Sequence, residues 1–383
     1  MIFLIIEFLD ELVFGLQEAA WPLIRDDLHL SYVQIGVLLS LPGLIANLVE
    51  PFLFVLGDIW KRRFIILAGG LFFTLSLAFT AVSQNFAFLL LAVVLFNPAS
   101  GAFVSLSQAS WMDSDPERHE SNMARWTFAG SLGVFIGPLI LGGLLTIGFG
   151  WRHAYLGLAV LSAIVLMMAI RHLTRASSGL DQIPSLKLVF ESFRNIFLSL
   201  RTPGILRWLV LLEFSDLMLD VFYGFLALYF VDVAGFTNTS AALAVAVWTG
   251  VGLLGDYLLI PLLDRVRGLA YLRVSVIIVL FLFPAFLIVS QPLIKLILVG
   301  LLGLLNSGWY AILRANLFTA MPGKSGAVLV LDNISGFFGR LLPFGIGLAA
   351  QAYGLGVAIW ILLLGPLALI IGLPGSYSQS ADA

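Results

Sequence analysis

The chain has 383 residues, of which 60% are hydrophobic and only 11% are charged, and its mean hydropathy is +1.04. This composition excludes a soluble globular domain and predicts an all-α polytopic membrane protein. The formal net charge of -2 is close to neutral and favours no nucleic-acid partner, while the lack of cysteine excludes disulfides and thiolate metal sites.

Twelve apolar windows follow one another along the chain, each near the length of about 20 residues that crosses the hydrocarbon of a bilayer. The first window lacks the basic region and cleavage site of a signal peptide, so we expect a retained membrane helix, with a natural start that can lie upstream of Met1. The predicted membrane helices are 2–24, 32–56, 64–82, 87–111, 126–147, 153–170, 207–231, 240–262, 274–290, 293–319, 327–350 and 355–373.

An acidic tetrapeptide occurs twice, as Glu7-Phe8-Leu9-Asp10 and as Glu213-Phe214-Ser215-Asp216, 206 residues apart. The same offset pairs further residues of like chemistry, so the chain is predicted to contain two related units. We expect an N-terminal six-helix bundle over 1–170 and a pseudo-symmetric C-terminal bundle over 207–383. The paired residues are Asp26 with Asp232, Ser31 with Thr237, Glu50 with Asp256, Asp58 with Asp264, Pro116 with Pro322, Gly130 with Gly336 and Gly133 with Gly339.

Residues 171–206 form the one long connection, and apolar residues recur at helical spacing within 186–197. This pattern predicts an amphipathic helix on the cytoplasmic membrane face, acting as a tether or, alternatively, as a regulatory segment. Lysine and arginine sort by side, with fifteen after the even-numbered windows and three on the other side. The bias places both termini in the cytoplasm and the protein in the cytoplasmic (inner) membrane.

Buried charge is confined to six of the windows, and nine carboxylates there accompany two arginines. An ionised side chain on an apolar helix costs roughly 2.5–3.5 kcal/mol at the bilayer centre, so these stripes should line an aqueous pathway. Desolvation and mutual repulsion favour protonation of several carboxylates, which is the chemistry of a proton relay or a cation site. The predicted proton-coupling residues are Glu7, Asp10, Glu50, Glu213, Asp216 and Asp256. For Glu7 and Glu18, solvation near a helix end is the alternative explanation.

The predicted substrate-binding residues are Glu11, Asp220, Trp309, Tyr310, Arg314 and Arg340. Arg314 is interpreted as the counter-ion of Glu213, Asp216 and Asp256, or alternatively as an anchor for an anionic substrate. Trp309 and Tyr310, next to Arg314, are candidates for the apolar wall of a ligand site. The partner of Arg340 cannot be predicted from the sequence.

The stretch Gly57-Asp58-Ile59-Trp60-Lys61-Arg62-Arg63 resembles the loop motif of the major facilitator superfamily, and Asp264-Arg265-Val266-Arg267-Gly268 is its counterpart in the second half. The resemblance implies two six-helix bundles locked together on the cytoplasmic side. It gives gating roles to Asp58, Arg62, Arg63, Asp264 and Arg265.

Two shorter stretches resemble subgroups of that superfamily. Residues 133–143, with Gly133, Gly137 and Pro138, are similar to the glycine-proline motif of its antiporters, with a plain helix-packing motif as the alternative. Residues 30–38 resemble the second helix of fosmidomycin-resistance-type exporters.

Together these features predict a secondary active transporter that works by alternating access and exports a small amphiphilic or cationic compound in exchange for protons. Uptake of a nutrient or anion by symport, sodium coupling and lipid flipping are the alternatives. No H-E-x-x-H or G-x-S-x-G motif occurs and no histidine lies deep in a window, so an enzyme is not predicted. The expected partners are a small-molecule substrate, protons or sodium and membrane lipid, with no cofactor or metal, and we expect a monomer.

Overall fold

A computed structural model describes residues 1–59, 61–114, 119–173, 203–263, 265–320, 335–337 and 339–374. Over these residues all regular secondary structure is helical. The predicted amphipathic helix in 186–197 lies outside the described residues, so the bounds of the connection remain a prediction.

The helices of the first half follow the predicted windows closely, because each apolar segment can satisfy its backbone hydrogen bonds internally only as a helix. The fourth membrane helix runs through a short π-helical segment, η1, without leaving the helical path. The elements are α1 (Ile2–Leu28), α2 (Tyr32–Ile59), α3 (Arg62–Val82), α4 (Phe86–Ser100), η1 (Gly101–Ser105), α5 (Leu106–Ser114), α6 (His119–Thr146) and α7 (Trp151–Leu173).

The second half repeats this order, and three of its membrane helices are composite. The elements are α9 (Pro203–Asp216), η3 (Leu217–Val221), α10 (Phe222–Asp232), α11 (Asn238–Leu263), α12 (Gly268–Ile288), α13 (Pro292–Asn306), α14 (Trp309–Thr319), α16 (Leu342–Tyr353), α17 (Leu355–Ala358), η4 (Ile359–Leu363) and α18 (Leu364–Gly372). The break between α13 and α14 falls at Ser307 and Gly308, where φ is +74°. The 206-residue offset aligns this break with η1 of the first half. The fourth helix of each half therefore departs from regular α-helical geometry at the same place in the repeat.

Nine helices in the described part of the chain are long and apolar enough to cross a membrane. α1 is not among them because it carries six acidic residues, Glu7, Asp10, Glu11, Glu18, Asp26 and Asp27. Its length of 27 residues is nevertheless ample for a span. The predicted all-α polytopic fold with two related six-helix halves is confirmed.

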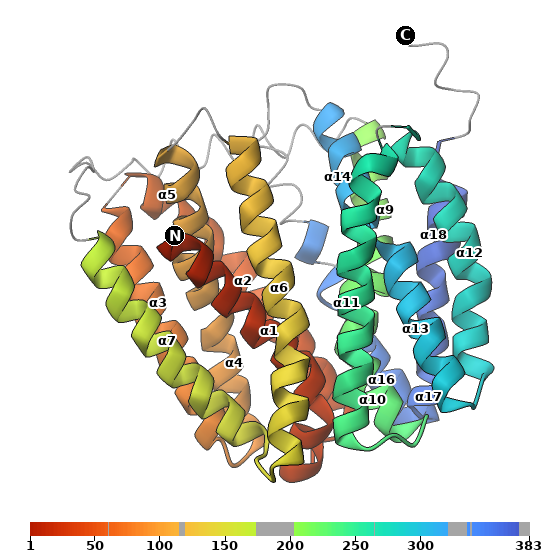
Figure 1. Cartoon of the computed structure of the whole chain (residues 1–383), viewed down its shortest axis with the longest axis horizontal. Helices are drawn as coiled ribbons and strands as arrows, with labels where there is room; N and C mark the ends of the chain where they lie inside the picture. Colours follow the sequence, from red (N-terminus) through yellow and green to blue (C-terminus); the bar gives the residue numbers. More distant parts are fainter. Residues whose placement is uncertain are drawn as a thin grey trace.

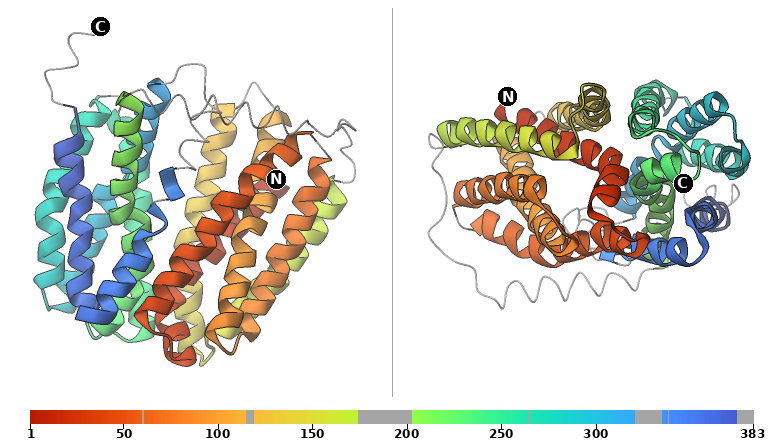
Figure 2. Two further views of the ribbon diagram at one scale, coloured as in Figure 1. Left: turned by 180° about the vertical axis from the view of Figure 1, so that it is seen from behind. Right: turned by 90° about the horizontal axis from the view of Figure 1, so that it is seen from below.

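The two halves form two bundles that lie side by side, α1–α7 in one and α9–α18 in the other (Figures 1 and 2). They meet mainly through four helix pairs, α2 with α16, α6 with α11, α1 with α10 and α1 with α11. The α1–α2, α6–α7 and α10–α11 connections lie at one end of the molecule, which we call the Arg25 end (Figure 1). The contact of Ser40 Oγ with the amide of Phe344, at 2.9 Å, joins α2 to α16 in the half of the molecule nearer that end.

The closest helix packing in the first bundle joins α1 to α6 through glycine residues. A Cβ atom placed on Gly133 would lie 2.5 Å from the carbonyl oxygen of Phe8 and 2.8 Å from the amide nitrogen of Leu12. Gly137 is equally tight against Leu16. Small residues let two helix backbones approach closely, so this stretch acts as a packing motif here.

We therefore expect Gly133→Ala to lower the free energy of unfolding by about 1–3 kcal/mol, because the added methyl group overlaps the α1 backbone. The measurement is unfolding in mixed micelles at increasing denaturing detergent. Gly143→Ala in the same helix is the matched control: no atom lies within 4 Å of a Cβ there. It should be neutral or stabilise by up to about 1 kcal/mol, and equal losses in both variants would contradict the packing explanation.

Candidate transport site

Two of the six α1 carboxylates, Glu7 and Glu18, are deeply buried. Glu7 is 8% exposed and faces α6, since a Cβ atom on Gly130 would lie 2.7 Å from Glu7 Oε1 and the Trp126 side chain is its hydrogen-bonding neighbour. Glu18 is 3% exposed and accepts a hydrogen bond of 3.0 Å from Trp21 Nε1. The alternative that Glu7 and Glu18 are merely solvated near helix ends is therefore wrong.

The next two carboxylates meet in the middle of the first bundle. Asp10 accepts a hydrogen bond of 2.8 Å from Ser100 Oγ, at the end of α4. Glu50 of α2 packs against Gly101, where a Cβ atom would lie 2.6 Å from Glu50 Oε1. Asp10 and Glu50 are electrostatic neighbours. The junction of α4 with η1 thus brings these predicted residues together.

Arg340 supplies the positive charge that links the bundles. Its side chain extends from the second half onto α2, where a Cβ atom on Gly43 would lie 2.8 Å from Arg340 Cδ. Glu50 from the first bundle and Asp220 from the second are both electrostatic neighbours of this guanidinium. Glu11 of α1 is in turn a neighbour of Asp220. The charged neighbours of Arg340, which the sequence left open, are therefore two carboxylates, one from each bundle.

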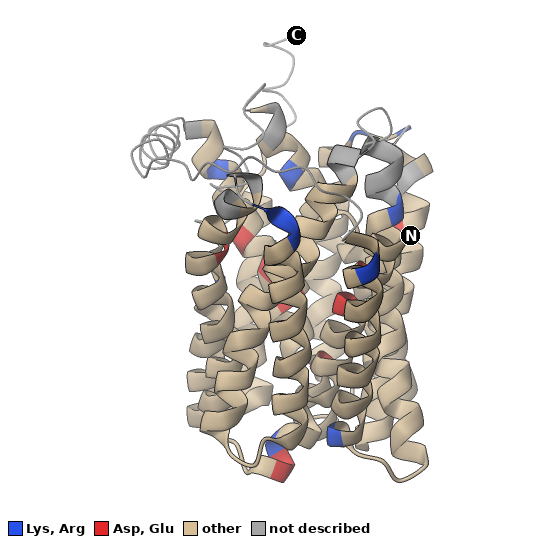
Figure 3. Ribbon diagram, turned by 90° about the vertical axis from the view of Figure 1, so that its left-hand side faces the viewer, with Lys and Arg blue, Asp and Glu red and all other residues tan. Residues whose placement is uncertain are grey.

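The glutamates of the acidic repeat have similar surroundings in the two halves, although the glycines that they face, Gly130 and Gly339, are not repeat counterparts. Glu213, the counterpart of Glu7, packs against Gly339 just before α16, as Glu7 packs against Gly130 in α6. In each bundle the first helix thus presents a glutamate to a glycine of the fifth helix. Asp216 is half-buried on the same turn of α9. Figure 3 shows that most acidic positions lie along the length of the helices, away from their ends, whereas most basic positions lie near the helix ends.

Arg314 and Tyr310 lie together, one turn apart on α14. Arg314 Nη1 donates a hydrogen bond to the Tyr310 hydroxyl, and the guanidinium carbon lies 5.1 Å from the centre of the Tyr310 ring. Tyr310 is 40% exposed, and its role in a ligand site remains a prediction. The predicted pairing of Arg314 with Glu213, Asp216 and Asp256 remains a prediction.

Two predicted site residues have other surroundings than expected. Trp309 is fully buried and donates a hydrogen bond of 2.7 Å from Nε1 to Ser275 Oγ of α12, so it packs inside the second bundle and does not form a ligand wall. Asp256 is exposed on α11, and the backbone N–H of Gly308 donates a hydrogen bond to it. This contact places Asp256 at the break between α13 and α14.

The predicted gating residues are described only in part. The Asp58 side chain and the whole of Asp264 lie outside the described residues. Arg62 Nε donates a hydrogen bond of 3.1 Å to a backbone carbonyl of α2, and the Arg63 guanidinium lies 4.8 Å from the centre of an aromatic ring on α3. Arg265 is exposed at the end of α11. The gating roles therefore remain predictions.

A polar cluster at the Arg25 end was not predicted. Arg25 forms ion pairs with Asp26 and with Asp232, which is the repeat counterpart of Asp26 in the other bundle. The Tyr32 hydroxyl also donates to Asp232, and the Tyr32 amide donates to Gln351 Oε1 at 3.2 Å. We call this cluster of Arg25, Asp26, Tyr32, Asp232 and Gln351 the Arg25 latch. Its only signal in the sequence was an arginine on the side that carries few basic residues, next to a repeated aspartate.

Two bundles of membrane helices with charged side chains held between them are the architecture of a secondary transporter and not of an enzyme. The chain belongs to the Major Facilitator Superfamily, whose sequence profile matches residues 3–343. A relative of the chain is the "Uncharacterized MFS-type transporter YwfA" of Bacillus subtilis (strain 168), with 25% identity over 246 residues. That match covers 62% of this chain and 57% of YwfA, little more than half of the relative.

Solved transporter structures share the fold. A bacterial homolog of the human lysosomal transporter Spinster, in an inward-facing and unoccupied conformation, superposes with a TM-score of 0.71 at 18% identity, covering 97% of this chain and 93% of the homolog. The nucleoside transporter NupG superposes with a TM-score of 0.76 at 13% identity, covering 97% of both chains. At these identities the similarity shows the fold alone.

The Arg25 latch gives the first prediction from the site. Asp232→Asn removes the charge that holds Arg25 across the two bundles, so this end should separate more often. The chain has no cysteine, which allows specific spin labels at Phe149→Cys and Tyr353→Cys, two exposed positions of opposite bundles at this end. Distances between the labels should become longer and broader in pulsed electron resonance.

Asp27→Asn is the control for this measurement. Asp27 pairs with Arg152 of α7, so its ion pair stays within the first bundle. The label distances should not change in this variant. An Asp232→Asn protein with unaltered distances would show that the latch does not hold the two bundles together.

Arg340 gives the second prediction. Arg340→Ala leaves Glu50 without its positive neighbour, so the variant should unfold more easily. Combining it with Glu50→Gln should recover part of the loss, with a coupling free energy of at least about 0.5 kcal/mol in a double-mutant cycle. Glu7→Gln, a buried carboxylate that faces α6, should be additive with Arg340→Ala. Additivity for Glu50 as well would contradict the cross-bundle interaction.

Proposed function

We propose that the protein exports a small amphiphilic or cationic compound in exchange for protons. The observation that carries this proposal is the carboxylate cluster that runs from Asp10 and Glu50 in the first bundle to Glu11 and Asp220 at the contact with the second bundle. Arg340 is the cation that the described structure places beside it. Whenever a few of these carboxylates are ionised, the potential between the bundles is negative and attracts cations.

The same cluster supplies a mechanism for exchange. A proton and a cationic substrate both stabilise a carboxylate by neutralising its charge, so each weakens the binding of the other by the same factor. Asp10, Glu50, Glu7, Glu213, Asp216 and Asp256 are the proposed proton-coupling residues. In alternating access, the cluster would face one side of the membrane at a time.

The contacts between the bundles support a proposed state of this cycle. The Arg25 latch and the contact of Ser40 with Phe344 close the Arg25 end. If the termini are cytoplasmic, as the distribution of basic residues predicts, the structure corresponds to the inward-facing state. Phe52 of α2 and Tyr257 of α11, near the opposite end, are 61% and 71% exposed.

One observation favours a second candidate, proton-driven uptake of an anion. Arg314 and the exposed Tyr310 present a guanidinium and an aromatic ring side by side, which together suit a carboxylate or phosphate group on a substrate. We rank this candidate second because carboxylates outnumber the arginines among the contacts between the bundles.

The charge of the compound that is transported distinguishes the two candidate functions. Tetraphenylphosphonium should bind the purified transporter more tightly as the pH is raised through neutrality, because the carboxylates lose their protons, and its binding should release protons into a weakly buffered solution. The isosteric anion tetraphenylborate should bind more weakly. Preference for the anion, or affinity for the cation that falls with rising pH, would favour anion uptake centred on Arg314.

Transport itself is measured in proteoliposomes with an imposed pH gradient. Asp10→Asn should keep the fold, since it retains the shape of the side chain and the contact with Ser100, but should abolish gradient-driven transport of tetraphenylphosphonium. Asp27→Asn, outside the cluster, is the matched control. Full activity of Asp10→Asn would exclude Asp10 from proton coupling.

A further inference from the structure

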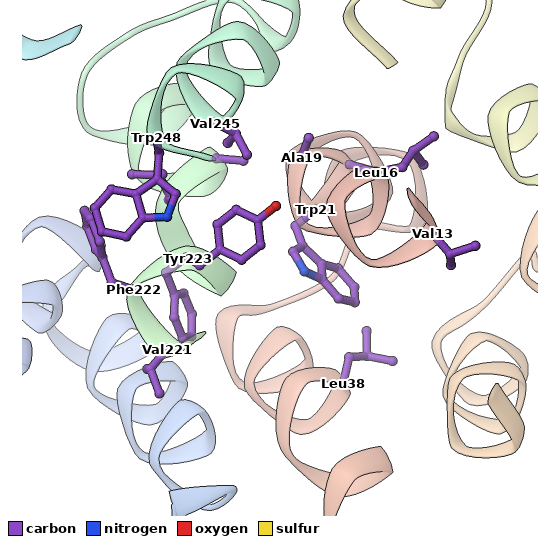
Figure 4. Packing of buried hydrophobic residues seen from close by; sticks show 14 of the residues in the cluster. Val13, Leu16, Ala19, Trp21, Leu38, Val221, Phe222, Tyr223, Val245 and Trp248 are labelled. Carbon is purple, nitrogen blue, oxygen red and sulfur yellow. The ribbon is translucent and has the colours of Figure 1, made fainter. Parts of the chain in front are cut away.

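Tyr223 of α10 lies in the contact between the bundles, and its hydroxyl has no hydrogen-bond partner among the residues that the structure describes. The side chain is 4% exposed. Figure 4 shows the ring extending from the second bundle with its hydroxyl directed toward α1. The ring of Phe14 on α1 packs against it with the centres 5.6 Å apart. A buried polar atom without a partner is unfavourable, so a functional reason for it has to be sought.

Among the described residues, the charged neighbours of this hydroxyl are all carboxylates. Glu18 and Glu11 from α1 and Asp220 from η3 are its electrostatic neighbours. α11 and α17 also pack against α10, and among the described residues they add no further charged neighbour of Tyr223. On the far side, Tyr155 of α7 is a neighbour of Glu18.

The three carboxylates differ in their access to the space between the bundles. Glu18 is closed off, because it is 3% exposed and a Cβ atom on Gly224 would lie 3.4 Å from its Oε2. Asp220, by contrast, is exposed, and Glu11 is half-buried. A proton on Glu18 therefore needs an intermediate group in order to exchange with Glu11 or Asp220.

A phenol hydroxyl can be that group because it donates one hydrogen bond and accepts others. The proposed transfer takes place when rotation of these side chains brings them within hydrogen-bond distance. The proton of a protonated Glu18 then passes to the Tyr223 oxygen while the hydroxyl proton passes to the carboxylate of Asp220 or Glu11. Glu18 becomes the carboxylate and the recipient becomes the acid. Tyr223 is neutral before and after the transfer, and the hydroxyl rotates to begin again.

We propose that Tyr223 is a proton relay between Glu18 and the pair formed by Glu11 and Asp220, and that Glu18 is the proton-binding group enclosed when the Arg25 end is closed. This inference rests on the proton coupling of the proposed function. It adds Tyr223, which the sequence did not single out, and it gives Glu18, one of the nine carboxylates of the membrane windows, a role of its own.

Tyr223→Phe tests the relay because it removes the hydroxyl and keeps the ring against Phe14. We expect pH-gradient-driven transport of tetraphenylphosphonium in proteoliposomes to fall roughly tenfold or more, the usual loss when a proton-transfer group is removed. Counterflow of tetraphenylphosphonium, which exchanges cation for cation without net proton movement, should be unchanged. Tyr155→Phe, a buried tyrosine beside Glu18 but inside the first bundle, is the matched control and should keep both activities.

Glu18→Gln provides a second test with Tyr223 intact, and it should show the same loss of gradient-driven transport with normal counterflow. Size exclusion and thermal unfolding check that each variant is folded. The relay is overturned if Tyr223→Phe or Glu18→Gln, in a folded form, transports at the wild-type rate under a pH gradient, or if gradient-driven transport and counterflow fall equally. A wild-type protein that does not respond to the gradient would instead refute the proposed function.

Discussion

The carboxylates of α1 constrain the structure more than any other group, since each would cost roughly 2.5–3.5 kcal/mol if ionised on an isolated helix at the centre of a bilayer. The protein distributes them among neighbouring elements. Glu7 faces a glycine of α6. Asp10 accepts a hydrogen bond from the hydroxyl of Ser100, and Glu18 accepts one from the indole N–H of Trp21. Close packing of α1 against α6 and the π-helical segment after α4 are the backbone features that make these contacts possible.

The internal repeat extends from the sequence to individual contacts. The glutamates that open the two acidic tetrapeptides both pack against a glycine of the fifth helix of their bundle, although these glycines lie one turn apart in the repeat. The fourth helix of each half departs from regular α-helical geometry at positions related by the 206-residue offset. Arg25 breaks the symmetry, because it binds Asp26 and its counterpart Asp232 at once. A single arginine between two equivalent carboxylates can therefore join the bundles without a second copy of itself.

Helix positions were predictable because apolar length and internal backbone bonding determine them, whereas contacts between helices were not. Arg340 comes close to Glu50 only when the two bundles pack together, and the sequence around Arg340 contains no pattern that predicts its neighbours Glu50 and Asp220. Trp309 was misplaced for a simpler reason. Successive residues on a helix point about 100° apart, so Tyr310, one turn before Arg314, shares its face while Trp309 turns toward α12.

The Arg25 latch and the enclosed Glu18 lie on the same helix, seven residues apart, and both involve the contact of α1 with α10. Separation of the bundles at this end would break the ion pair with Asp232 and bring water to Glu18 in one movement. Closure would reverse both, and it would leave Tyr223 between Glu18 and the exposed Asp220 on the other side. In the proposed relay, the occupancy of Glu18 by a proton and the state of the latch would be linked through one helix contact, which is what the proposed proton coupling requires.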